Sequence, residues 1–304
     1  MAKNPHSVTL VGQSPASRPS LEREAQTLSN EITRFLKEDL GEGDITTQRV
    51  VPEEAFARGY IIARENCVVA GIEIARAVFL ELDARLDYRA AVQDGEGVAV
   101  GTPVARLQGR AAPILTGERV ALNLLQRLSG IATLTRQYVE AVAGTGIQIY
   151  DTRKTTPGLR WLEKFAVRAG GGQNHRAGLY DAVLIKDNHI AIAGGLSAAV
   201  RRVRSADEGR MTIQVEVESF HQLGEALDLA VEAVLLDNMA PERVAQAVQL
   251  IRGHPNGQRC WIEASGGITL ENIRSYRETG VDAISVGALT HSARAVDLAL
   301  EVQL

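Results

Sequence analysis

Six short β-rich runs in the second half of the chain end in polar or charged residues or in a segment that contains glycine. They read IQIYDT, DAVLIKD, TIQVEVES, AVLLDN, CWIEASGG and AISVGA. Ligands of parallel sheets and barrels bind at the carboxyl ends of the strands, so these ends are expected to form the mouth of one pocket. The candidate residues are Arg153, Lys154, Lys186, Glu216, Asp237, Ser265, Gly266, Gly267, Gly287 and Ala288.

Cations outnumber acids among these candidates. The segment GGGQNHR adds His175 and Arg176 to the cations, and the acids are Glu216 and Asp237. Cations packed this closely repel one another unless an anion lies between them, and the arginine fork matches carboxylate or phosphate. The pattern predicts a ligand that carries several negative charges.

Two glycine-containing ends predict a phosphate site. SGGI precedes a predicted helix from Leu270 onward, and VGALTHS follows the last run. Backbone N–H groups at helix starts after glycine bind phosphate. The acids Glu216 and Asp237 suit Mg²⁺ on a diphosphate or a developing positive charge.

Structural roles compete with these functional ones. The sequence SGG also forms ordinary turns. Glu218 lies on the same strand face as Glu216, and one of the two is expected to pair with a lysine. Asp237 is alternatively the N-cap of a helix that starts near Pro241.

The segments between the six runs position these ends. Amphipathic helices alternate with the runs roughly every 20 to 35 residues, which is the rhythm of a parallel sheet or barrel. A closed eight-stranded barrel needs about 250 residues. The region is shorter, so a reduced barrel or an open sheet is expected.

The first part of the chain follows a different pattern. Residues 1–20 are expected to be a disordered tail. Helical spacing predicts a helix over 21–40, which Gly41 and Gly43 end. Short runs up to Gly117, with AAPILT as the last, predict an antiparallel α+β domain. A helix over 117–144, with Val120, Leu124, Leu128 and Leu134 buried, is expected to bridge the domains.

Composition excludes several classes of function. The 304 residues carry 33 Lys and Arg against 37 Asp and Glu, a net charge of −4, which gives no basic field for nucleic acid. No apolar run approaches the roughly 20 residues of a membrane span. The cysteines, Cys67 and Cys260, have no metal-ligand spacing and are expected to be reduced thiols of a cytoplasmic protein.

Long ordered motifs carry a resemblance to a known family. The sequence contains EDLGEGDITT, ERVALNLLQRLSGIATLT, DTRKTTPGLR, GGGQNHRAGLYDAVLIKDNH, VEVES, LLDN, EASGGI and VGALTHS, in that order. In this order the chain resembles the quinolinate phosphoribosyltransferases, also called carboxylating nicotinate-nucleotide pyrophosphorylases, from about residue 36 to 292.

The resemblance implies a fold and an assembly. It implies an incomplete β/α barrel over 131–290 and an N-terminal open-sandwich α+β domain over 21–130, to which 291–304 returns. It also implies a homodimer in which one subunit lends Arg119 to the site of its neighbour.

The resemblance further implies the reaction. Quinolinate and phosphoribosyl pyrophosphate give nicotinate mononucleotide, pyrophosphate and CO₂ in NAD biosynthesis, with Mg²⁺ and no organic cofactor. Lys154, Glu216 and Asp237 act on ribose and diphosphate, the two acids through Mg²⁺. The residues that clamp quinolinate are Arg119, Arg153, His175, Arg176 and Lys186. Those that hold the 5′-phosphate are Ser265, Gly266, Gly267, Gly287 and Ala288, with His291 nearby.

Three other functions remain open on the sequence. A relative acting on nicotinate or nicotinamide without CO₂ loss would need fewer cations. A Schiff-base aldolase would use Lys186 or Lys154, but it leaves the acids and glycines unexplained. A phosphometabolite sensor would bind without turnover, and the sequence carries no appended recognition domain.

Overall fold

The computed structural model describes residues 21–207 and 211–303; the expected tail, residues 1–20, lies outside them. The chain divides into two compact units. The sheet unit contains residues 21–136, Trp161–Gly171 and 292–303. The barrel unit contains Gln137–Arg160 and Gly172–His291.

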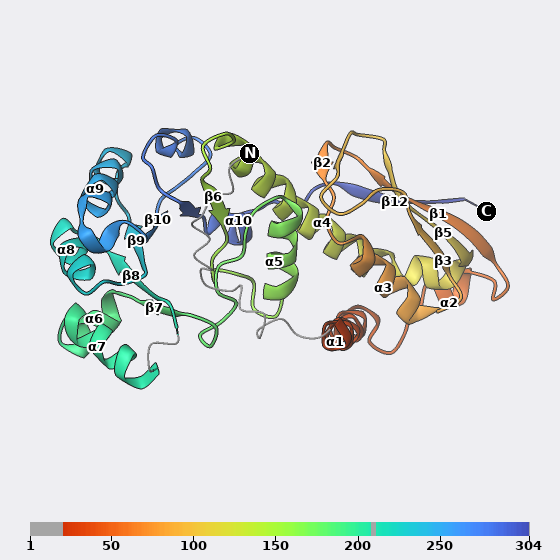
Figure 1. The fold of residues 1–304 in the computed structure, drawn as a ribbon. Coiled ribbons are helices and arrows are strands. Elements are labelled where there is room, and N and C mark those ends of the chain that lie inside the picture. The colour runs from red at the N-terminus through yellow and green to blue at the C-terminus, as the bar shows by residue number, and fades with distance from the viewer. Residues whose placement is uncertain (1–20, 208–210, 304) are drawn as a thin grey trace. The chain divides into compact units, whose positions relative to one another are not determined.

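The sheet unit is built on an antiparallel sheet with the order β12-β1-β5-β3. Its strands are β1 (Phe56–Ala63), β3 (Asp87–Ala90), β5 (Pro103–Arg110) and β12 (Leu298–Gln303), and β2 (Cys67–Val68) pairs with β4 (Gly97–Val98). The last strand, β12, pairs with most of β1, from Arg58 opposite Gln303 to Ala63 opposite Leu298 (Figure 1).

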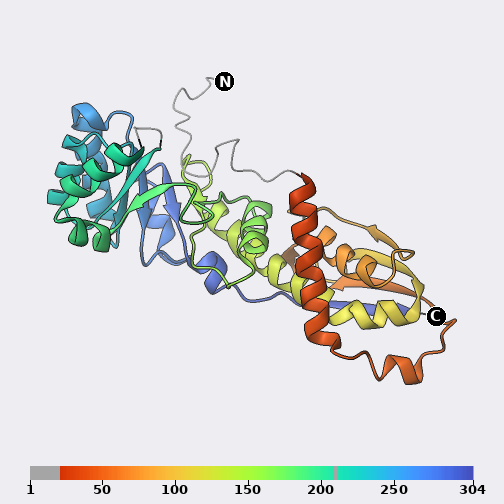
Figure 2. The ribbon, with the colours of Figure 1, turned by 90° about the horizontal axis from the view of Figure 1, so that it is seen from below.

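Helices cover this sheet. They are α1 (Leu21–Leu40), α2 (Thr47–Val50), α3 (Ile72–Leu82) and the first part of α4 (Ala111–Ala141). Figure 2 shows α1 as a straight helix beside α3. The expected end of α1 is confirmed, since turns at Gly41 and Gly43 follow it.

The long helix begins earlier than the sequence pattern predicted. AAPILT, expected as a β run, forms the first turns of α4, where Pro113 costs no hydrogen bond because first-turn N–H groups have no helical acceptor. Of the expected buried face, Val120, Leu124 and Leu128 are buried, and Leu134 is half-buried.

The barrel unit contains six parallel strands in the order β6-β11-β10-β9-β8-β7. The strands are β6 (Gln148–Tyr150), β7 (Val183–Ile185), β8 (Ile213–Val217), β9 (Ala233–Asp237), β10 (Trp261–Ser265) and β11 (Ala283–Ser285). Because β6 and β7 are the two edges of this order, the barrel is incomplete, and the predicted fold class is confirmed.

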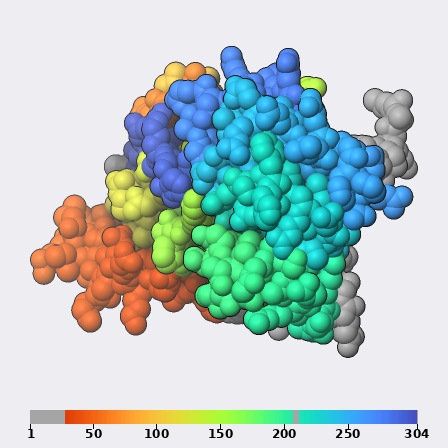
Figure 3. Space-filling model, turned by 90° about the vertical axis from the view of Figure 1, so that its left-hand side faces the viewer, coloured from red at the N-terminus to blue at the C-terminus, as the bar shows by residue number. Residues whose placement is uncertain are grey.

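Helices alternate with these strands. They are α6 (Asp187–Ala193), α7 (Leu196–Asp207), α8 (Phe220–Asp228), α9 (Pro241–Gly253) and α10 (Ala288–His291), with 3₁₀ turns at Pro255–Gly257 and Ile273–Tyr276. The helix that follows β6 in the chain, α5 (Arg160–Ala169), belongs to the sheet unit apart from its first residue. Val244, Ala247, Val248 and Ile251 form the buried stripe of α9. Figure 3 looks onto α6 to α9, which form this face of the barrel unit.

The predicted helix from Leu270 onward is wrong. Residues 270–272 form a turn, and Ile273–Tyr276 is a single 3₁₀ turn. The side chain of Asn272 accepts from the Thr269 N–H at 2.8 Å and donates to the Gly267 carbonyl at 2.9 Å. These bonds to the backbone stabilise a turn in place of a first helical turn.

Candidate active site

Parallel pairing places the six predicted strand ends at one edge of the sheet. Ser265 pairs in register with Asp237, Val217 with Leu236, and Ile185 with Val215. Because all six strands run in the same direction, their carboxyl ends face the same side. The mouth of the candidate site lies at this edge and contains the residues that follow each strand.

Lys186 and Glu216 form the shortest ion pair of the mouth. Lys186 Nζ lies 2.5 Å from Glu216 Oε2, and the side chains are 43% and 9% exposed. Glu218, two residues further along, is exposed. The expectation that one of the two acids pairs with a lysine is therefore confirmed, with Glu216 as the partner.

Arg153 and Arg176 form a second charge cluster, in which the acids Asp181 and Glu216 offset the repulsion between the two arginines only in part. Arg176 is 5% exposed, and its Nη1 donates to the Ala182 carbonyl at 3.2 Å. Burial lowers the pKa of Arg176, and the positive charge of Arg153 lowers it further. The buried Nε of Arg153 has no hydrogen-bond partner within the described residues. Two like charges and an unused donor favour binding of an anion.

The segment that carries Arg176 is fixed to strand β6. Gln173 forms a parallel bridge to Tyr150, at the edge of the sheet that β6 leaves open. The fully buried carboxylate of Asp151 accepts from the His175 backbone N–H at 2.8 Å and from Asn174 Nδ2 at 2.5 Å. These bonds fix the main chain directly before Arg176.

A buried polar cluster lies among the strands, and sequence reasoning missed it. Glu263, on β10, is 3% exposed; its Oε2 accepts from Gln214 Nε2 at 2.8 Å and lies 3.4 Å from His175 Nε2. Burial acts to raise the pKa of Glu263, but His175, with Ser285 and Gln214, more than offsets this, and the pKa lies below its usual value. The signal was a glutamate inside the apolar strand WIEA, because buried parallel strands are normally continuously apolar.

At the end of β11, the missing side chain of Gly287 allows Lys154 and His291 to approach the backbone closely. A Cβ on Gly287 would lie 3.0 Å from Lys154 Cδ and 3.1 Å from His291 Nε2, so these three residues are adjacent. Thr290 Oγ1 donates to the Lys154 carbonyl at 2.8 Å. The helix after Gly287 is the four-residue α10.

Gly266 is required by its conformation and its neighbour. Its φ is +89°, and a Cβ would come within 2.2 Å of Asn238 Oδ1. Asn238 in turn donates from Nδ2 to Asp237 Oδ2 at 2.7 Å. Asp237 is not the N-cap of α9, because Ala240 occupies that position.

Arg119 lies in the sheet unit, on α4. Its side chain is 60% exposed, and its Nη2 lies 3.7 Å from Glu118 Oε1. The other predicted site residues, including His291, Ser265 and Gly267, lie in the barrel unit.

The acids of the mouth, Glu216 and Asp237, are the candidate ligands for a metal ion. Within residues 21–207 and 211–303, no three His, Cys, Asp or Glu side chains are placed to hold a metal ion. Asp237 and Glu216 are oxygen donors, and Mg²⁺ is often held by one or two carboxylates together with substrate phosphates. The donor set fits a metal that is also held by the substrate.

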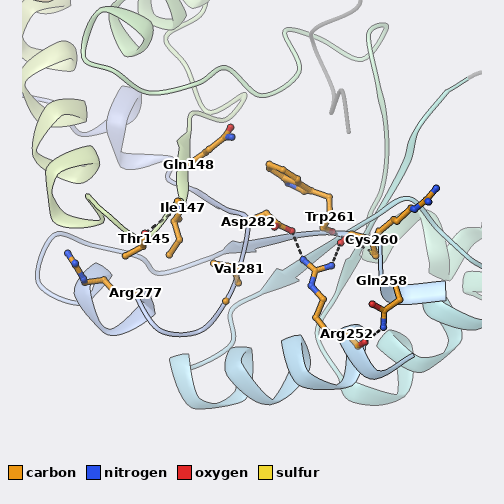
Figure 4. Close-up of a pocket in the computed structure, with 13 residues that line it drawn as sticks. Thr145, Ile147, Gln148, Arg252, Gln258, Cys260, Trp261, Arg277, Val281 and Asp282 are labelled. Carbon is orange, nitrogen blue, oxygen red and sulfur yellow. Dashed lines mark hydrogen bonds and ion pairs between the residues drawn. The ribbon is translucent and has the colours of Figure 1, made fainter. Parts of the chain in front are cut away.

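A cavity of about 470 Å³ lies at the opposite edge of the barrel sheet, at the amino ends of β6, β10 and β11. Figure 4 shows Arg252 in it, donating to Asp282 Oδ2 at 2.9 Å and to the Cys260 carbonyl at 2.7 Å. Arg277, also on its wall, donates to the carbonyls of Ala141 and Ala143. These arginines serve the fold, and none of the predicted site residues lines this cavity.

No helix of the described residues is long and apolar enough to cross a membrane. A parallel sheet whose carboxyl edge bears cations, acids and glycines defines an α/β enzyme with a site for a polyanionic substrate. Comparisons with known proteins specify this class. The sequence matches the quinolinate phosphoribosyl transferase N-terminal domain over residues 44–129 and the C-terminal domain over 131–301.

Relatives of similar length agree. The chain is 46% identical over 274 residues to the nicotinate-nucleotide pyrophosphorylase [carboxylating] of Mycobacterium leprae, covering 89% of this chain and 95% of the relative. A probable enzyme of the same name from Bacillus subtilis is 44% identical, covering 90% and 92%. The crystal structure of NadC from Streptococcus pyogenes superposes with a TM-score of 0.87 at 38% identity, covering 91% and 97%. The chain belongs to the quinolinate phosphoribosyltransferase family.

Proposed function

We propose that this chain joins quinolinate to phosphoribosyl pyrophosphate at the carboxyl edge of the barrel sheet. The products are nicotinate mononucleotide, pyrophosphate and CO₂, as in the carboxylating relatives of NAD biosynthesis. The observation that carries the site assignment is the Arg153–Arg176 cluster, in which the pKa of Arg176 is lowered and the Nε donor of Arg153 is unused. A dicarboxylate relieves this repulsion and supplies the missing acceptor. We place the enzyme in the cytoplasm.

Quinolinate binds between the cations of the mouth. Arg153 and Arg176 hold its carboxylates with paired N–H donors, while Lys186 adds a third positive charge beside Glu216. His175, the next member of the predicted clamp, is buried and accepts from the Arg176 backbone N–H. Fixed orientation of the pyridine nitrogen against the ribose contributes up to about 7–11 kcal/mol to catalysis.

Phosphoribosyl pyrophosphate occupies the glycine side of the mouth. Lys154 binds the diphosphate, and Ser265, Gly266, Gly267, Gly287, Ala288 and His291 surround the 5′-phosphate. The adjacency of Lys154, Gly287 and His291 supports this placement. Without a long helix after either glycine-containing end, individual backbone N–H groups and side chains carry the phosphate contacts.

Bond breaking at the ribose leaves a positive charge that the acids face. When pyrophosphate departs, the anomeric carbon gains oxocarbenium character, and the carboxylates of Glu216 and Asp237 stabilise it. The pyridine nitrogen then forms the new bond. When the C–CO₂⁻ bond breaks, its electron pair stays on the ring carbon, where the adjacent cationic nitrogen stabilises it, and this carbon then takes a proton from solvent. No organic cofactor is needed for the loss of CO₂.

Mg²⁺ is expected to arrive with the diphosphate, whose negative charge it neutralises. Asp237 is the stronger candidate ligand, because Glu216 is already paired with Lys186. Arg119 is proposed to complete the quinolinate clamp of a neighbouring subunit in a homodimer. Its exposed position on α4 supports a role at a surface.

The direct test combines the purified protein with quinolinate, phosphoribosyl pyrophosphate and Mg²⁺. We expect nicotinate mononucleotide and CO₂ in equal amounts. Turnover of nicotinate instead would support the non-decarboxylating relative, and turnover of neither would overturn the proposal. Borohydride trapping of a lysine adduct would identify an aldolase.

A further inference from the structure

The imidazole of His175 uses both ring nitrogens inside the protein. Nδ1 accepts from the Arg176 backbone N–H at 2.9 Å, and Nε2 lies 3.4 Å from Glu263 Oε2. Because Nδ1 accepts this bond, Nε2 is the ring nitrogen that directs a proton toward Glu263. Tyr150 packs edge-on against the ring, with centroids 6.3 Å apart. Position, plane and tautomer of His175 are thus all fixed.

Glu263 is an ionised group in the interior of the barrel unit. Its hydrogen-bond partners hold its pKa below the usual value despite its burial, so it is negatively charged at neutral pH. Stability alone does not favour this arrangement, since replacing buried ionic groups with apolar ones is often neutral or stabilising. Another benefit must therefore account for the charge.

The buried charge of Glu263 helps to hold the backbone of Arg176 in place. Asp151 accepts from the His175 backbone N–H and so fixes the main chain before Arg176. Glu263 contacts the His175 imidazole, and this imidazole accepts from the Arg176 backbone N–H. The backbone of Arg176 is therefore held by two buried carboxylates. Such support matters because its guanidinium must stay buried close to Arg153, which repels it.

We infer that Glu263 is a positioning residue of the substrate site. It sets the tautomer and plane of His175, and through His175 it holds Arg176 in the orientation that binds a substrate carboxylate. The inference rests on the proposed function of Arg176 in quinolinate binding. Glu263 itself is buried, and we assign it no contact with substrate: it acts through its contact with His175.

The test is Glu263→Gln, which keeps the shape of the side chain and an acceptor but removes the charge. We expect the KM for quinolinate to rise about tenfold, which corresponds to about 1.4 kcal/mol. The KM for phosphoribosyl pyrophosphate should stay within about twofold, because that substrate binds away from Arg176. Glu278→Gln, at an exposed glutamate of the same unit, is the matched control and should change neither value.

A double-mutant cycle separates positioning from general damage. His175→Asn retains an amide near the Nδ1 position and removes the group that reaches Glu263. If Glu263 acts through His175, adding Glu263→Gln to this variant changes the quinolinate KM no further. Additive effects, an unchanged KM in Glu263→Gln, or equal rises in both KM values would overturn the inference.

Wild-type turnover keeps the two proposals apart. Absence of product from quinolinate in the wild-type protein refutes the proposed function. A wild type that makes nicotinate mononucleotide, with an unaffected Glu263→Gln variant, refutes only the positioning role. If the Gln variant fails to fold, the same measurement on Glu263→Asp, which keeps the charge but shortens the side chain that reaches His175 Nε2, decides the question: an unchanged quinolinate KM refutes the role.

Discussion

Replacing Arg153 by alanine removes half of the charge cluster that defines the quinolinate end of the mouth. In the free protein Arg153 lowers the pKa of Arg176, and its Nε has no hydrogen-bond partner within the described residues. Both observations indicate that the Arg153 guanidinium is placed to bind an anionic ligand. The expected result is a large loss of quinolinate affinity without a loss of protein stability.

The magnitude follows from the bonds that are lost. A guanidinium fork makes two hydrogen bonds to a carboxylate, and each bond to a charged group contributes about 1.5–3 kcal/mol. Loss of both weakens quinolinate binding by at least about 3 kcal/mol, which is more than about 100-fold in Kd. In the free variant Arg176 no longer faces a like charge, so the melting temperature should equal or exceed that of the wild type.

Titration calorimetry with quinolinate, and separately with phosphoribosyl pyrophosphate, measures both affinities. Phosphoribosyl pyrophosphate should bind Arg153→Ala as it binds the wild type. Arg153→Lys keeps the positive charge but lacks the two-pronged guanidinium, so its affinity for quinolinate should lie between those of the wild type and Arg153→Ala. Arg259→Ala, at an exposed arginine at the opposite edge of the sheet, is the control. A wild-type quinolinate Kd in Arg153→Ala, or an equal loss for both ligands, would refute the clamp assignment.

Three further predictions follow from the described contacts. Mixing inactive Arg119→Ala and Lys154→Ala variants should restore about a quarter of wild-type activity if a C₂ dimer shares Arg119; no recovery after proven subunit exchange would exclude the loan. Gly266→Ala should destabilise the protein by about 1–3 kcal/mol in urea unfolding, since its φ is +89° and a Cβ would contact Asn238; an unchanged midpoint would contradict this. The pKa of Glu263 is lowered in the folded state, so its ionised carboxylate stabilises the fold fully above the unfolded pKa, and this stabilisation is lost as pH falls through the folded pKa. Between neutral pH and the folded pKa, Glu263→Gln should therefore lose less stability than the wild type. Melting temperatures that fall in parallel with pH for both proteins would contradict this.

The sequence predicted the features that depend on strand order and charge. Six runs with polar ends were enough to place the mouth, because parallel strands bring their carboxyl ends to one edge. The pairing of a lysine with Glu216 or Glu218 also followed from type and spacing. The roles of individual residues within the mouth remain predictions.

Three features depended on contacts that the sequence pattern does not contain. AAPILT has the composition of a strand, yet it continues into the apolar stripe of α4, and tertiary packing decided its conformation. The residues after SGG have helical spacing, but Asn272 bonds the backbone and forms a turn. Glu263 was read as part of a strand, because its donors come from residues about 50 and 90 positions away.

The pairing of β12 with β1 has a consequence for how the chain folds during synthesis. Residues 137–160 and 172–291 are made between the two strands, so β1 has emerged from the ribosome long before its neighbour exists. Until β12 appears, one edge of β1 presents unpaired N–H and C=O groups, which can template pairing with other chains. The barrel unit can begin to fold while the first-made sheet is still one strand short. The sheet unit, although most of it is synthesised first, is completed last.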